Sequence, residues 1–85
     1  MFWLILWKIV CMAYYFTEKI RKQMGKNIRK IRKQKKLKQV EVAVDAGLNA
    51  SYYGKIERGL VNPSLKKLYR IIKALGVHSS EVLPF

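Results

Sequence analysis

Cysteine and histidine are almost absent from this chain of 85 residues, which contains only Cys11 and His78, far apart. A single cysteine excludes an internal disulfide framework and a cysteine-based zinc cluster. Acidic residues are also scarce: five of them face 18 lysines and arginines, which leaves a net charge of +13. That imbalance indicates a polyanionic partner, which is nucleic acid or, less often, an anionic membrane surface. A hydrophobic content of 51% argues against a disordered basic tail and for one small folded domain.

An apolar run long enough to cross a membrane is also missing. Residues 1–16 are apolar apart from Lys8, but a spanning helix needs about 20 residues, and a central lysine costs about 2.5–3.5 kcal/mol. No basic residue precedes this run and no small-residue cleavage site follows it, which disfavours a secretory signal. Three interpretations of residues 1–23 stay open: a dispensable extension upstream of a start at Met24, a membrane-associating helix, and a packed helix. The first two leave the rest of the chain in the cytoplasm.

The apolar spacing after residue 23 predicts five short helices and no strand. Met24, Ile28 and Ile31 form one helical stripe, which Ile20 continues backward, and this helix should end near Lys36. The second helix is expected over residues 39–46 and the third over residues 50–58. Three residues mark their ends: Gly47 and Gly59 as terminators and Asn49 as the cap of the third helix.

The last two helices are predicted from turn signals. The fourth starts after Asn62-Pro63-Ser64 and ends at Gly76, and the fifth is capped by Ser79 or Ser80 and runs through Leu83. The side chains expected in the core of the fourth helix are Leu65, Leu68, Ile72 and Leu75, and the tyrosines expected in the core are Tyr53 and Tyr69.

Residues 39–58 have the geometry of a helix-turn-helix, with Gly47-Leu48-Asn49 as the turn between two short helices. Ala43 is small where the two helices approach, and lysines stand at the entry to the first. The free N–H groups and the positive dipole end of that helix suit a phosphate. The leading end of the second helix carries small or polar side chains that fit into a groove.

Residues 24–83 resemble the Cro/C1-type, lambda-repressor-like helix-turn-helix domain of phage repressors and related bacterial regulators. The matching segments are IRKIR at 28–32, LKQ at 37–39, AGLN at 46–49, YGKIERG at 53–59, NPSL at 62–65 and ALGV at 74–77. The resemblance implies an all-α, compact five-helix domain that binds duplex DNA, usually as a dimer, and regulates transcription. The chain is accordingly divided into an apolar, helical extension over 1–23 and a DNA-binding domain over 24–85.

The resemblance also implies roles for particular residues. The base-facing positions of the third helix are Ala50, Ser51 and Lys55, with Tyr52 flanking them. The expected phosphate contacts are Lys36, Lys38, Gln39, Asn49 and Arg58. Two departures from the family stand out: Lys38 replaces a capping Ser or Thr, at a cost of about 1 kcal/mol, and Gly54 interrupts the recognition helix, at a similar cost.

No enzyme is predicted, because no nucleophile, base and orienting group come together, and no cofactor or metal is expected. Glu57 and Arg58 are interpreted as a local pair at a helix end rather than a catalytic one. Two functions stay open: a sequence-specific DNA-binding regulator (repressor, restriction-modification controller or antitoxin), or a membrane-associated basic protein anchored through residues 1–16, with a membrane-tethered DNA-binding domain as a hybrid. A weak homodimer on a palindromic site is expected, through Val77, Val82, Leu83 and Phe85.

Overall fold

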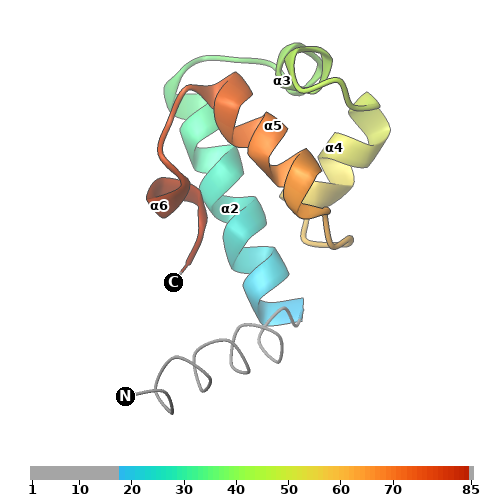
Figure 1. Ribbon diagram of the computed structural model, residues 1–85, viewed down its shortest axis with the longest axis vertical. Coiled ribbons are helices and arrows are strands. Elements are labelled where there is room, and N and C mark those ends of the chain that lie inside the picture. Colours follow the sequence, from blue (N-terminus) through green and yellow to red (C-terminus); the bar gives the residue numbers. More distant parts are fainter. Residues whose placement is uncertain (1–17, 85) are drawn as a thin grey trace.

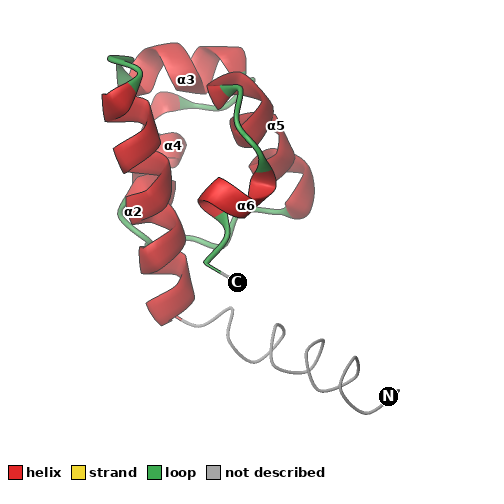
Figure 2. Ribbon diagram, turned by 90° about the vertical axis from the view of Figure 1, so that its left-hand side faces the viewer, coloured by secondary structure: helices red, strands yellow, loops and turns green. Residues whose placement is uncertain are grey.

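The computed structural model describes residues 18–84, which form five helices and no strand. The helices are α2 (Glu18–Gln34), α3 (Gln39–Asp45), α4 (Ala50–Glu57), α5 (Leu65–Leu75) and α6 (Ser79–Val82). Figure 1 shows α2 as the long central helix, with α3 and α4 on one side of it and α6 on the other. Seen from the side in Figure 2, α6 lies between α2 and α5 and contacts both. The all-α, five-helix architecture predicted from the sequence is therefore confirmed for this part of the chain.

Capping residues set most of the helix ends. The Asn49 side chain accepts hydrogen bonds from the N–H groups of Ser51 and Tyr52, and Ser64 accepts one from Lys67. These side chains satisfy donors that a helix N-terminus leaves free. Three helices are followed by a glycine with positive φ, as predicted: Gly47, Gly59 and Gly76.

The first and last helices begin or end at other residues than expected. α2 starts at Glu18 and ends at Gln34, after which Lys36 takes a left-handed φ of 57°. The predicted division at residue 24 thus falls inside a helix, and the division itself stays a prediction. Neither Ser79 nor Ser80 caps α6. That position belongs to His78, whose backbone N–H donates to the Glu81 carboxylate.

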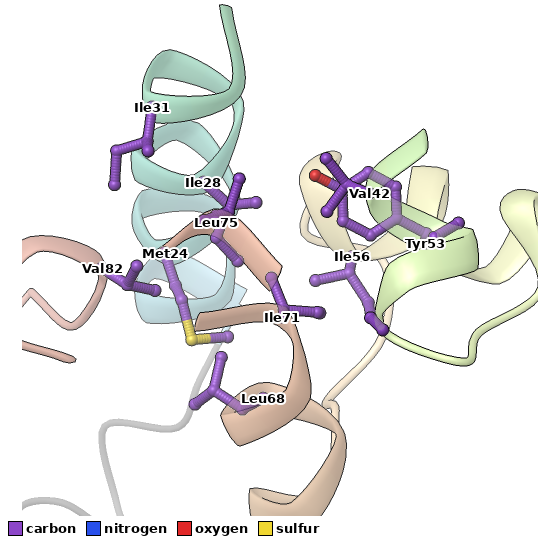
Figure 3. Close-up of a cluster of buried hydrophobic side chains, with 12 residues drawn as sticks. Met24, Ile28, Ile31, Val42, Tyr53, Ile56, Leu68, Ile71, Leu75 and Val82 are labelled. Carbon is purple, nitrogen blue, oxygen red and sulfur yellow. The ribbon is translucent and has the colours of Figure 1, made fainter. Parts of the chain in front are cut away.

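Every described helix contributes to a single core, drawn in Figure 3. Its largest fully buried side chains are Met24, Ile28, Val42, Tyr53, Ile56, Ile71, Leu75 and Val82. The Asn27 side chain donates to the Val82 carbonyl oxygen at 2.9 Å, which ties α6 to α2. The predicted stripe of α2 and the burial of Tyr53 are confirmed.

Two predicted core residues of α5 are wrong. Leu65 is 82% exposed and Tyr69 is 63% exposed, whereas Ile71 is fully buried. The buried residues Leu68, Ile71 and Leu75 follow the helical spacing of three and four residues. Tyr69 follows Leu68 directly, so it points about 100° away from that stripe. Leu65 has the spacing of the stripe, but as the first residue of α5 it lies at the edge of the core.

Residues 1–16, on which the membrane interpretation rests, lie outside the described residues. Among residues 18–84, the structure contains no helix that is both long enough and apolar enough to span a bilayer.

Candidate nucleic-acid interface

The exposed face of α4 carries the residues that the sequence placed against bases. Ala50 and Ser51 lie in its first turn and Lys55 one turn after Ser51, and all three are exposed. Ser51 and Lys55 are four residues apart, so they are neighbours on the helix surface. The opposite face holds Tyr53 and Ile56 in the core. The helix therefore presents a short polar stripe to solvent, while its opposite face is held in the core.

Tyr52 differs from these three because it is half-buried and turned toward α5. The ammonium of Lys67 lies over its ring, 4.5 Å from the centroid. A cation over an aromatic face is attracted by the ring quadrupole. Tyr52 is thus held at the flank of the stripe, next to a lysine that the sequence analysis did not select.

The entry to α3 holds two of the residues expected at phosphates. Lys38 occupies the N-cap position, is exposed, and makes no capping bond with its side chain, because an ammonium has no acceptor. The carboxylate of Glu41 accepts a hydrogen bond from the Lys38 backbone N–H at 3.1 Å instead. Half of a capping arrangement therefore remains at this helix end, and the Lys38 side chain extends into solvent.

Gln39 is engaged in a way that the sequence did not reveal. Its side-chain amide donates to the Glu57 carboxylate at 3.0 Å. The same carboxylate accepts two bonds from the Arg32 guanidinium, at 2.7 and 3.2 Å. The prediction that Glu57 pairs locally with Arg58 is wrong, since its partners come from α2 and α3. Arg32 also donates to the Leu37 carbonyl oxygen at 2.9 Å, which fixes the loop between those helices.

The hydrogen bonds of this buried network shift the pKa values of Glu57 and Arg32. Glu57 is 5% exposed, and burial alone would raise the pKa of its carboxyl group. Hydrogen bonds from Arg32 and Gln39 outweigh burial and hold that pKa below the ordinary value of 4.5. The same bond to Glu57 raises the pKa of Arg32. The carboxylate is therefore charged at neutral pH, and the end of α4 is linked electrostatically to α2 and α3.

A small hollow opens above this network. It has a volume of about 190 Å³ and is lined by Arg29, Arg32, Gln39, Glu57 and Arg58. We call it the Gln39–Arg58 hollow. Arg29 and Arg58 are exposed at its edge, and neither forms an ion pair with any residue in the described range 18–84. Two free guanidinium groups beside an amide suit a phosphate oxygen.

The remaining predicted contacts lie apart from this hollow. Asn49 uses its side-chain oxygen as the α4 cap, which leaves its amide N–H groups available. Lys36 lies exposed in the loop after α2 and does not line the hollow. The sequence analysis missed Arg29 and Arg32. Arg32 bonds to Glu57, 25 residues away, and Arg29 lines the hollow beside them, so no local pattern marked either arginine.

Comparisons with known proteins agree with this geometry. Residues 28–82 match the helix-turn-helix family. The immunity repressor protein of Bacillus phage phi105 is 43% identical over 60 residues, which cover 71% of this chain and 42% of the length of that repressor. A solved structure of the restriction-modification controller protein C.AhdI from Aeromonas hydrophila superposes with a TM-score of 0.72 at 33% identity, over 74% of this chain and 96% of that one. The controller C.Esp1396I, solved as a tetramer with its natural 35 base-pair operator, gives a TM-score of 0.67 at 31% identity, over 72% and 80% of the two chains.

Proposed function

The chain belongs to the helix-turn-helix family, in its Cro/C1 type, and is a DNA-binding transcriptional regulator. We propose that Ser51 and Lys55 contact the bases of its operator. The contacts with the DNA backbone would come from Lys38, Gln39 and Arg58. This separation of base contacts from phosphate contacts is supported by two neighbouring features: the exposed polar side chains on α4, and the hollow with two guanidinium groups that are unpaired within residues 18–84. Family members of this kind regulate transcription and are not enzymes.

The recognition helix would lie in the major groove with its N-terminal end leading. Ser51 and Lys55 then approach base edges, where lysine suits guanine and a hydroxyl group suits several acceptors. Ala50 offers only a methyl contact, which suits thymine. The Gln39–Arg58 hollow would receive one backbone phosphate, and Lys38 and Asn49, which do not line it, would meet others. Because Gln39 is already held by Glu57, it needs little ordering when the phosphate arrives.

We expect Lys38→Ala and Lys55→Ala to weaken binding in different ways. The salt slope is the steepness with which the logarithm of the binding constant falls against the logarithm of the salt concentration. Loss of a phosphate contact lowers this slope by about 0.9 and weakens binding to all sequences alike. Loss of a base contact costs about 1–3 kcal/mol of discrimination at one base pair of each half-site. Lys38→Ala should therefore show the first pattern and Lys55→Ala the second, with Ser51→Ala a weaker version of the second. Affinities for single-base operator variants at several salt concentrations measure both.

Lys73→Ala supplies the control, because it removes the same charge from the far end of α5. It should leave the base preferences unchanged and lower the salt slope by clearly less than Lys38→Ala does. If Lys55→Ala weakens every operator variant equally, Lys55 belongs with the phosphate contacts and the reading is carried by DNA shape. The operator itself is found by selecting bound duplexes from a random pool with the full chain.

A controller role in a restriction-modification system is the form of regulation that we favour, since the match extends over 96% of the C.AhdI chain. The phage repressor is matched over 42% of its length. Genes for a restriction endonuclease and its methyltransferase beside this gene would support the controller role. A phage integration region at that place would support the repressor role instead.

We also propose that two copies bind a palindromic site, but through a different surface from the one predicted. Val82 is fully buried and Val77 and Leu83 pack against the core, while Phe85 lies outside the described residues. The large apolar side chains that remain exposed on α5 are Leu65 and Tyr69, one turn apart. An exposed apolar pair of this kind suits a contact between copies, and the relative C.Esp1396I assembles on its operator as a tetramer.

Leu65→Ser combined with Tyr69→Ser should abolish cooperative binding to two half-sites about 10 bp apart, centre to centre. Affinity for an isolated half-site should stay within a few-fold of the parent. Val44→Ser, at another exposed apolar residue on α3, is the control. Sedimentation and footprinting distinguish the outcomes, and a double variant that still fills both half-sites cooperatively would refute this interface.

A further inference from the structure

The exposed side of α2 carries a continuous strip of cations that, apart from Arg29, have no role in the site described above. The strip consists of Lys22, Lys26, Arg29 and Lys33, all exposed. Their spacing of four, three and four residues keeps them on one side of the helix. From Lys22 to Lys33 the strip is about 16 Å long at 1.5 Å per residue, so it is long enough to follow several phosphates of one strand.

Two contacts show that this strip borders the end of the recognition helix. Gly59 follows Arg58 directly, and a Cβ atom built on it would lie 2.7 Å from the Cα of Lys22. Arg29, two strip members beyond Lys22, lines the Gln39–Arg58 hollow itself. The strip therefore meets the hollow at Arg29 and lies against the residue after Arg58 at Lys22. Lys33 extends it by about one more turn beyond Arg29.

The strip is only weakly neutralised by the protein. Lys22 pairs with Glu18 at 2.9 Å, but both side chains are more than half exposed, so this pair contributes little. Lys26, Arg29 and Lys33 form no ion pair with any residue between 18 and 84. Keeping four cations on one helix side is unfavourable unless an anionic partner covers them. Lipid headgroups and nucleic-acid phosphates both offer such charge.

We propose that the α2 strip is a second backbone-binding surface, which holds the phosphodiester strand that continues from the Gln39–Arg58 hollow. The inference rests on the proposed DNA-binding function and extends it from the helix-turn-helix to α2. Duplex DNA is favoured over an anionic membrane because the strip adjoins the end of α4, whose stripe would lie in the groove of the same duplex. The contact adds affinity without adding sequence preference, because it meets only phosphates.

The test compares two double variants of the full chain. Lys22→Gln with Lys33→Gln removes two strip charges. Lys19→Gln with Lys30→Gln removes two charges from another side of the same helix. Gly25 marks the face of α2 that packs on α4, and Lys19 and Lys30, six and five residues from it, point away from that face. All four side chains are exposed, so each variant should fold like the parent, as circular dichroism would show. The probes are operator duplexes, random duplexes, and vesicles made of phosphatidylcholine and phosphatidylserine in equal parts.

The strip variant should lower the salt slope by about 1.8, which is two phosphate contacts, on operator and random duplexes alike. The control should lower it by less than half as much. Equal slopes for the two variants would overturn the inference, and so would a strip variant that loses vesicle binding while its DNA slope is unchanged. If the parent and both variants fail to bind any duplex, it is the proposed function that fails. That result is distinct from a failure of the strip alone.

Discussion

Gly25→Ala is expected to destabilise the domain strongly, although alanine is normally the better residue inside a helix. Gly25 lies in α2 where that helix crosses α4. A Cβ atom there would lie 2.6 Å from the carbonyl oxygen of Ile56 and closer still to that of Glu57. Both obstacles are backbone atoms of a packed helix, so they cannot move aside without separating α2 from α4. Overpacking of this kind costs about 3 kcal/mol, which is a large part of the stability of a small domain.

Gly54→Ala is the matched control, since Gly54 is also buried and also helical. Its added methyl group would find nothing closer than the Gln39 side-chain oxygen at 3.7 Å. Alanine should therefore stabilise the domain there by about 0.5–1 kcal/mol, through its higher helix propensity. Thermal and urea unfolding of the two variants measure the contrast. A Gly25→Ala protein as stable as the parent would mean that α2 and α4 are not in this close contact.

The elements that the sequence predicted well are those specified by neighbouring residues. Asn49 and Ser64 cap their helices, and Gly47, Gly59 and Gly76 follow theirs with positive φ. Each of these signals acts within one helical turn, so it can be recognised without the rest of the fold. Burial on α5 was less predictable. Tyr69 is apolar enough for a core, but its position on the helix turns it away from the side that buries Leu68, Ile71 and Leu75.

The parts that sequence reasoning missed depend on residues far apart along the chain. Arg32 and Glu57 are separated by 25 positions, and nothing local distinguishes this pair from the ordinary charges around it. The requirement for Gly25 is likewise visible only once α4 lies against it. The roles proposed for Ser51, Lys55 and Lys38 stay predictions, whereas Gln39 gained an unexpected partner in Glu57 that holds it in place.

Glu57→Gln should be the second strongly destabilising change. The carboxylate is almost wholly buried and accepts bonds from Arg32 and Gln39. Glutamine keeps the shape but removes the charge, and it leaves the Arg32 guanidinium, itself only 11% exposed, without a counter-ion. Removing one partner of a buried ion pair costs about 3 kcal/mol or more. Asp45→Asn is the control, because Asp45 is an exposed acid on α3, and it should change stability by at most about 0.5 kcal/mol.

The pH dependence of this loss separates a charge effect from a packing effect. Hydrogen bonds from Arg32 and Gln39 lower the pKa of Glu57 below 4.5 in the folded protein, in spite of burial. A carboxyl group with a depressed folded pKa contributes its full stabilisation above the unfolded pKa, and that contribution is lost as pH falls through the folded pKa. The parent should therefore lose stability below pH 4.5, whereas the glutamine variant has no charge to lose at this position. Urea unfolding at neutral and acid pH should show the gap between parent and Glu57→Gln narrowing as the solution is acidified, while the gap for Asp45→Asn stays small throughout. A Glu57→Gln gap that is the same at every pH would show that the loss comes from altered packing, and that Arg32 does not depend on the Glu57 charge.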